Sequence, residues 1–128
     1  MKEIIKTDKA AQPVGPYNQA VRHKDLLFVS GQIPMDPATG ELVKGDVRDQ
    51  TRLVMENMKA ILEAAGMDFS HVVKCSIFIS DMNDFPKVNE VYASFFREDP
   101  PARETVQVGA LPKFVDVEIS CIAAGSGQ

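Results

Sequence analysis

Two charged residues in the C-terminal third of the chain have side chains suited to chemistry on a small molecule. Arg103 follows Pro100 and Pro101, and Glu118 lies in an alternating segment at 115–121. An arginine can bind a carboxylate through two parallel hydrogen bonds, and a glutamate can move protons or hold water. Proline restricts the backbone that leads into Arg103, so the guanidinium is constrained. The pair would suit an enzyme that acts on a small carboxylate without a cofactor.

Both residues also have an ordinary structural interpretation. Exposed ion pairs are common, so Arg103 could be a surface arginine that pairs with a neighbouring acid, namely Glu98, Asp99 or Glu104. Glu118 could be a solvated strand residue. Taken alone, neither residue distinguishes a catalytic site from an unremarkable surface.

Length and composition indicate one globular domain over residues 1–128. The chain is 45% apolar and 25% charged, which is ordinary for a globular protein. Its formal net charge is −4 and its pI is about 5.1, and lysines and arginines form no patch. A nucleic-acid partner is therefore disfavoured, because phosphate backbones bind to positive surface.

The cysteines and the N-terminus favour a cytoplasmic protein. Cys75 and Cys121 lie in alternating, strand-like runs, where a buried, reduced thiol is the expected state. Residues 1–5 do not form the apolar region of a signal peptide, and no apolar run approaches the ~18 residues of a membrane span. We expect a reducing compartment and no membrane partner.

Hydrophobic periodicity predicts an α+β fold. Apolar residues recur at helical spacing over 46–65 and 84–96, with Asp46 and Asp84 as the expected caps. Alternation and turn residues predict strands at 3–7, 18–23, 26–30, 71–80, 104–108 and 115–124. The two helices should cover one face of a mixed sheet. Apolar residues on both sides of the 71–80 strand indicate that the other face packs against another subunit.

Several further polar or backbone positions are candidates for ligand contact. Tyr17 follows a Gly-Pro loop and could offer its hydroxyl, although an aromatic ring packed under a loop is equally consistent. Ser30 and Gly31 could present a hydroxyl and close backbone, or form a simple turn. Asn89 lies on the second helix, where an exposed asparagine is the ordinary expectation. No metal-ligand spacing, phosphate loop or dinucleotide motif occurs, so neither metal nor cofactor is expected.

Taken together, these segments resemble the RidA (YjgF-type) family of enamine and imine deaminases. The matching segments are GPY at 15–17, VSGQIP at 29–34, DMNDF at 81–85, VN at 88–89, PARETVQV at 101–108 and VEI at 117–119. They span nearly the whole chain, in the family's order and at similar spacing. The most specific of them are SGQIP and PAR.

The resemblance implies a fold, an assembly and an activity. The fold would be a chorismate mutase-like α+β subunit that forms a homotrimer with clefts between neighbouring subunits. The activity would be hydrolysis of reactive 2-imino acids, such as iminopropanoate and iminobutanoate, to 2-keto acids and ammonia. This reaction protects pyridoxal phosphate enzymes and wider metabolism from reactive intermediates. The expected partners are a small imino or keto acid and further copies of the chain.

The resemblance also implies roles for individual residues. Arg103 would bind the substrate carboxylate and Glu118 would position or activate water. The pocket would be shaped by Tyr17, Ser30, Gly31, Asn89 and Thr105. Many active members have cysteine where this chain has Thr105, which keeps a hydroxyl and lacks a thiol. A role that needs a nucleophilic sulfur is thereby excluded, whereas hydrolysis without a covalent step is not.

Two rival functions remain at this point. The chain could be a trimeric module that binds 2-keto acids for regulation and does not turn them over. It could also act on RNA, as is reported for parts of the family, although the acidic charge balance disfavours this.

Overall fold

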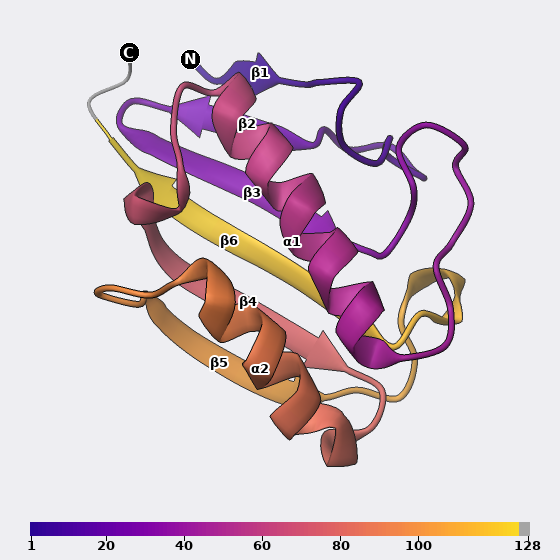
Figure 1. Cartoon of the computed structure of the whole chain (residues 1–128). Helices are drawn as coiled ribbons and strands as arrows, with labels where there is room; N and C mark the ends of the chain where they lie inside the picture. The colour runs from indigo at the N-terminus through magenta and orange to yellow at the C-terminus, as the bar shows by residue number, and fades with distance from the viewer. Residues whose placement is uncertain (126–128) are drawn as a thin grey trace.

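The chain forms one mixed β-sheet with two helices packed on the same face (Figure 1). The computed structural model describes residues 1–125. The strands are β1 Glu3–Ile5, β2 Ala20–His23, β3 Leu26–Gln32, β4 Val72–Ile79, β5 Ala102–Gln107 and β6 Val117–Ala124. Their order across the sheet is β1-β2-β3-β6-β4-β5. The predicted α+β fold, with both helices on one face, is confirmed.

Helix α1, Val47–Ala64, follows its sequence signals closely. The Asp46 carboxylate caps it by accepting a 2.8 Å hydrogen bond from the backbone N–H of Arg48. Gly66 follows the C-terminal end with a φ of +76°, a left-handed conformation that glycine adopts without strain. The apolar stripe of α1, which includes Val54, Met58 and Leu62, is fully buried against the sheet.

Helix α2, Phe85–Phe95, crosses the same sheet face and connects the parallel strands β4 and β5. Pro86 lies in its first turn, where no N–H is needed. Asp84 stands at the expected cap position and makes no capping hydrogen bond. Asp81 instead caps the preceding 3₁₀ turn at Met82–Asp84. Neither these helices nor the shorter helical turns of residues 1–125 could span a membrane.

β1, β2 and β6 are each two residues shorter than predicted, and the three other strands differ from the prediction as well. β3 continues through Gly31, which was expected to end it, and its pairing with β6 shifts register between Val29 and Gln32. β5 begins at Ala102, so Arg103 lies within a strand rather than before one. β4 has a register irregularity at its start that buries Val72 and exposes Val73, so the alternation of the rest of the strand does not extend to Val72.

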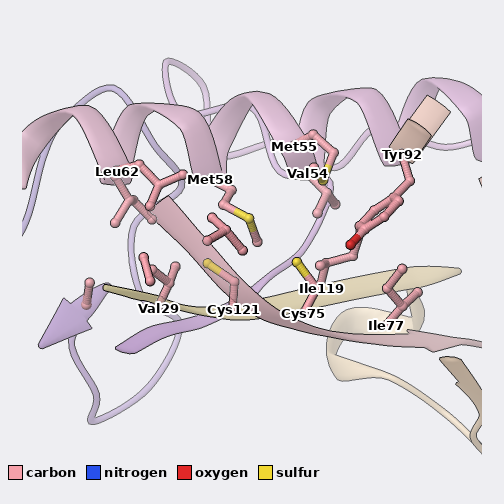
Figure 2. Close-up of a cluster of buried hydrophobic side chains, with 14 of the residues drawn as sticks. Val29, Val54, Met55, Met58, Leu62, Cys75, Ile77, Tyr92, Ile119 and Cys121 are labelled. Atoms are coloured by element: carbon pink, nitrogen blue, oxygen red, sulfur yellow. The ribbon is translucent and has the colours of Figure 1, made fainter. Parts of the chain in front are cut away.

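The hydrophobic core fills the space between the helices and the sheet (Figure 2). Cys75 on β4 and Cys121 on β6 are directly opposite each other in this layer, and both are buried free thiols, as expected. The core side chains of β6 alternate with those that point to the other face. Ile119 is fully buried, whereas its neighbour Glu118 is half-buried on the opposite side.

The helix-free face of the sheet presents apolar side chains to solvent in the single chain. Five large residues on four of the strands are at least 40% exposed there, namely Ile4, Leu26, Phe28, Val73 and Val106. A dispersed set of this size on a flat sheet face is typical of a surface that another molecule covers.

We predict that the core side of β6 determines the stability of the strand that carries Glu118. Truncating Ile119 to alanine should lower the free energy of unfolding by about 2–5 kcal/mol, because the fully buried site cannot collapse completely. Ile119→Val, which removes one methyl group, should cost about 0.5–1.5 kcal/mol. Chemical denaturation measures both, and equal effects of the two variants would contradict this view of the core.

Candidate active site

Glu118 projects from the helix-free face of the sheet. It is paired with Phe78 of β4, and the buried residues Val117 and Ile119 on either side of it point toward the helices. The start of β6 is held in place by Asp116, whose carboxylate accepts hydrogen bonds from the Gln50 side chain at 2.8 Å and the Ser80 hydroxyl at 3.0 Å. The strand that carries Glu118 is therefore anchored to both α1 and β4.

Four of the predicted site residues gather around one hollow, which we call the glutamate hollow. Its volume is about 300 Å³, and its walls are Val14, Tyr17, Ser30, Gly31, Ile33, Pro112 and Glu118. The Tyr17 hydroxyl accepts a hydrogen bond from the Val14 backbone N–H at 3.1 Å. The Ser30 hydroxyl donates to the Asn18 carbonyl at 2.6 Å. The loop before β2 is thus tied to the wall of the hollow.

Gly31 makes the Glu118 side chain fit. A Cβ atom at position 31 would lie 1.8 Å from Oε2 of Glu118 and 2.9 Å from its Cγ. No real side chain is compatible with such a contact, so Glu118 can adopt its observed conformation only beside a glycine. The two residues come from the neighbouring strands β3 and β6, next to the irregularity in their pairing.

The Glu118 carboxylate has no hydrogen-bond or ion-pair partner among residues 1–125. Burial raises its pKa above the usual value of 4.5. A half-buried carboxylate without a compensating cation is poised to exchange protons or to hold water. Within the described residues, no group of three His, Cys, Asp or Glu side chains could hold a metal ion.

Arg103 lies on the other face of the sheet, on the edge strand β5. It pairs in the parallel ladder with Cys75, whose side chain points into the core beneath the helices. Its guanidinium extends toward α2, with Cζ 5.5 Å from the ring centre of Phe85 and 4.9 Å from that of Tyr92. The arginine is therefore in contact with aromatic rings of the helix that leads into its own strand.

Arg103 makes no ion pair among residues 1–125, and the surface-pair interpretation is wrong for this structure. The neighbouring Glu104 points to the helix-free face. There it forms an ion pair with Lys74 at 2.9 Å and accepts a hydrogen bond from the Ser76 hydroxyl. The charge of Arg103 is thus left available for a ligand.

A second hollow, the arginine hollow, opens beside this guanidinium. Its volume is about 450 Å³, and its walls are Asn89, Tyr92, Ala93, Phe96, Pro100, Pro101 and Arg103. Asn89 is half-buried here rather than fully exposed. Thr105, two residues along β5 from Arg103, has a buried hydroxyl with no hydrogen-bond partner in the described part of the chain. An unpartnered buried hydroxyl beside a free guanidinium suits an anionic ligand.

The predicted site residues thus fall into two groups that a single chain does not bring together. Tyr17, Ser30, Gly31 and Glu118 line the glutamate hollow, whereas Asn89 and Arg103 line the arginine hollow. β4 separates β6 from β5, and Glu118 and Arg103 point to opposite faces. A small molecule cannot contact both residues of one subunit.

Sequence reasoning missed the aromatic partners of the arginine. The sequence patterns gave neither Tyr92 nor Phe85 a role at the site. A signal was nonetheless present, because the two residues are seven positions apart and so lie on one face of α2. The wall residues Val14, Ile33 and Pro112 had no distinguishing pattern.

The fold and the hollows define a small α+β protein in which a half-buried glutamate lines one hollow and an arginine lines another. Residues 7–125 match the family model described as Endoribonuclease L-PSP. The chain belongs to this family, the RidA and YjgF proteins, as the sequence motifs predicted.

Named relatives cover nearly the whole chain. A RutC family protein of Pyrococcus horikoshii is 57% identical over 123 residues, which span 96% of this chain and 98% of that protein. Reactive Intermediate Deaminase A, chloroplastic, of Arabidopsis thaliana is 48% identical over 95% of this chain and 65% of its own length. A crystal structure of Escherichia coli TdcF with bound serine has a TM-score of 0.92 at 47% identity, covering 97% of this chain and 99% of that one.

We predict that a methyl group at position 31 displaces the Glu118 carboxylate. Gly31→Ala should force Glu118 into another rotamer and lower the free energy of unfolding by roughly 1 kcal/mol. The loss should disappear in a Glu118→Ala background, where the clashing atoms are absent. Gly109→Ala is the matched control, because a Cβ there meets nothing within 4 Å. Denaturation of the four variants tests the contact, and an equal loss with and without the Glu118 side chain would contradict it.

We also predict the sign of the effect of Glu118 on stability. Because its pKa is raised on folding, the folded protein binds the proton more tightly, and stability falls as pH rises above 4.5, the usual value. In the dissociated subunit, where no cation of a neighbour reaches Glu118, Glu118→Gln should therefore raise the melting temperature at pH 7, and the gain should shrink below pH 4.5.

Glu104→Gln provides a control of opposite sign. Hydrogen bonds from Ser76 and Lys74 lower the pKa of Glu104, so this variant should lose stability at neutral pH. Thermal unfolding between pH 3 and pH 8 compares the two variants. A lower melting temperature for Glu118→Gln at pH 7 would contradict the assignment.

Proposed function

We propose that the protein is a hydrolase that converts reactive 2-imino acids, and their enamine tautomers, to 2-keto acids and ammonia. One observation carries the proposal: among residues 1–125, the Arg103 guanidinium that lines one hollow has no ion pair, and the half-buried Glu118 carboxylate that lines the other has no partner. The names of relatives support it, since one of them is a reactive intermediate deaminase that is 48% identical to this chain. Destruction of such intermediates would protect pyridoxal phosphate enzymes.

The working site would be formed by two copies of the chain. A small imino acid cannot reach Arg103 and Glu118 of one subunit, because these residues point to opposite faces of the sheet. If the helix-free face of one subunit packs beside β5 and α2 of another, the two hollows meet and the exposed apolar side chains are covered. We propose a homotrimer, which would contain three such sites.

The proposed reaction needs only binding and proton transfer. Arg103 binds the carboxylate through its two-pronged fork, and Thr105 adds a hydroxyl donor. Glu118 accepts a proton from water as its oxygen adds to the carbon of the protonated C=N bond, which gives a tetrahedral amino alcohol. Glu118 returns the proton to nitrogen and then accepts the hydroxyl proton of the intermediate as the C–N bond breaks, which releases ammonia and leaves the C=O group of the 2-keto acid. The Glu118 carboxyl then gives that proton to ammonia or to solvent. Proton transfer of this kind contributes about 10²- to 10⁴-fold.

A small substrate is consistent with these residues. TdcF from Escherichia coli has been crystallised with serine, which carries a carboxylate and a nitrogen on the adjacent carbon, as a 2-imino acid does. The family model's description mentions ribonuclease activity, but the net charge of −4 gives this chain no general attraction for RNA. We therefore favour imine hydrolysis over RNA cleavage.

We predict that both charged residues are required for turnover. In a coupled assay, an amino acid oxidase generates the imino acid and formation of the keto acid is followed. Glu118→Gln should lower kcat by about 10²-fold or more, because the proton acceptor is lost. Arg103→Ala should mainly raise KM, because carboxylate binding is lost. Unchanged rates in both variants would exclude the mechanism, and keto acid binding without turnover by the wild type would indicate a binding module.

A mixed-subunit experiment tests whether the site is shared. At a substrate concentration well below the KM of the wild type, Arg103→Ala and Glu118→Gln should each have little activity alone. After refolding together in equal amounts, they should recover about one quarter of wild-type activity, because about one interface in four combines two intact residues. Refolded wild type and each variant refolded alone are the controls. No recovery in verified mixed oligomers would show that both residues act within one subunit.

A further inference from the structure

The guanidinium of Arg103 is held by aromatic rings and not by a carboxylate. Its Cζ lies 4.9 Å from the ring centre of Tyr92 and 5.5 Å from that of Phe85, both within the ~6 Å at which a ring face attracts a cation. We propose that Phe85 and Tyr92 are positioning residues that fix the Arg103 fork in the orientation that receives a ligand carboxylate. This inference rests on the proposed carboxylate-binding role of Arg103.

The elements that carry these residues form a rigid frame. Phe85 begins α2 and Tyr92 lies two turns further along, so both rings lie on the helix face that covers the sheet. Arg103 approaches them from β5, the strand to which α2 leads, and β5 is fixed by its parallel pairing with β4. A site on a helix and a strand holds its geometry better than one on loops.

Contacts with aromatic rings leave the N–H donors of the Arg103 guanidinium free to bind a carboxylate. An acidic partner would stabilise the charge of Arg103 but would use the same N–H donors that a substrate carboxylate needs. A ring face attracts the planar cation and takes none of the donors at its edge. The absence of an ion pair to Arg103 among residues 1–125 agrees with this division of roles.

The ring of Tyr92, and not its hydroxyl, is the part that acts on Arg103. Tyr92 is only 5% exposed, and its hydroxyl has no hydrogen-bond partner of standard geometry among the described residues. Burial raises the pKa of the Tyr92 hydroxyl far above its usual range, so the phenol stays neutral and offers no negative charge. A phenylalanine at position 92 should therefore position the Arg103 guanidinium as the tyrosine does.

Calorimetric titration with 2-oxobutanoate tests the inference. Phe85→Leu and Tyr92→Leu should each weaken binding about 3- to 30-fold, the range expected for loss of a partly desolvated cation–π contact. Tyr92→Phe should restore most of the lost affinity. Phe95→Leu is the matched control, because Phe95 is a partly buried aromatic residue of the same helix that packs on Phe69. Thermal unfolding of each variant identifies any that fail to fold. If the variant of the more deeply buried Tyr92 does not fold, the affinity of Phe85→Leu tests the inference by itself.

Repeating the truncations in an Arg103→Lys background separates positioning from general damage. Lysine keeps the charge but has no flat face, so the loss caused by Phe85→Leu or Tyr92→Leu should shrink to less than about 2-fold. An undiminished loss in that background, a comparable loss in Phe95→Leu, or no loss in either truncation would overturn the inference. If wild-type protein fails to bind 2-oxobutanoate, or Arg103→Ala binds it as well as wild type, the proposed function fails instead.

Discussion

The alternation of side chains along paired strands is the constraint on which the rest of this structure depends. On β6 it places Ile119 in the core and Glu118 on the helix-free face, and on β5 it turns Arg103 toward the helices and Glu104 away from them. Register cannot shift by one residue without moving every core side chain into solvent. The burial of the apolar core therefore also fixes the separation of the two groups that could act on a substrate.

That separation has an electrostatic consequence. The guanidinium of Arg103 lies against neutral rings, and within the described part of the chain neither it nor the carboxylate of Glu118 has an ion-pair partner. Burial of an unpaired carboxylate is unfavourable, as the raised pKa of Glu118 reflects. In a site shared by two subunits, the Arg103 guanidinium of one subunit would lie near the Glu118 carboxylate of the other. The same contact would complete the site and offset the unfavourable burial of the carboxylate, which links the proposed assembly to the proposed activity.

The sequence predicted local structure well and long-range pairing poorly. Helix α1 was placed within one residue at each end, because a cap at Asp46, a strong apolar stripe and Gly66 all agree. The burial of Val72, the exposure of Val73 and the continuation of β3 through Gly31 were not predicted, because register shifts arise from pairing with β6 and leave no local pattern. The candidate site residues were predicted from the resemblance of sequence motifs, and their division between two faces depends on a strand order that periodicity does not encode.

The buried thiols bear on the chemistry that the proposed site would use. Cys75 and Cys121 are in the core, and burial raises the pKa of both, so neither offers a thiolate nucleophile. Thr105, near Arg103, has a hydroxyl group and no thiol. A threonine hydroxyl needs an adjacent base to become nucleophilic. The described residues show no such base hydrogen-bonded to it, since its hydroxyl has no partner. A protonated imine carbon is already electrophilic, so water held by a carboxylate is sufficient and a covalent step is unnecessary.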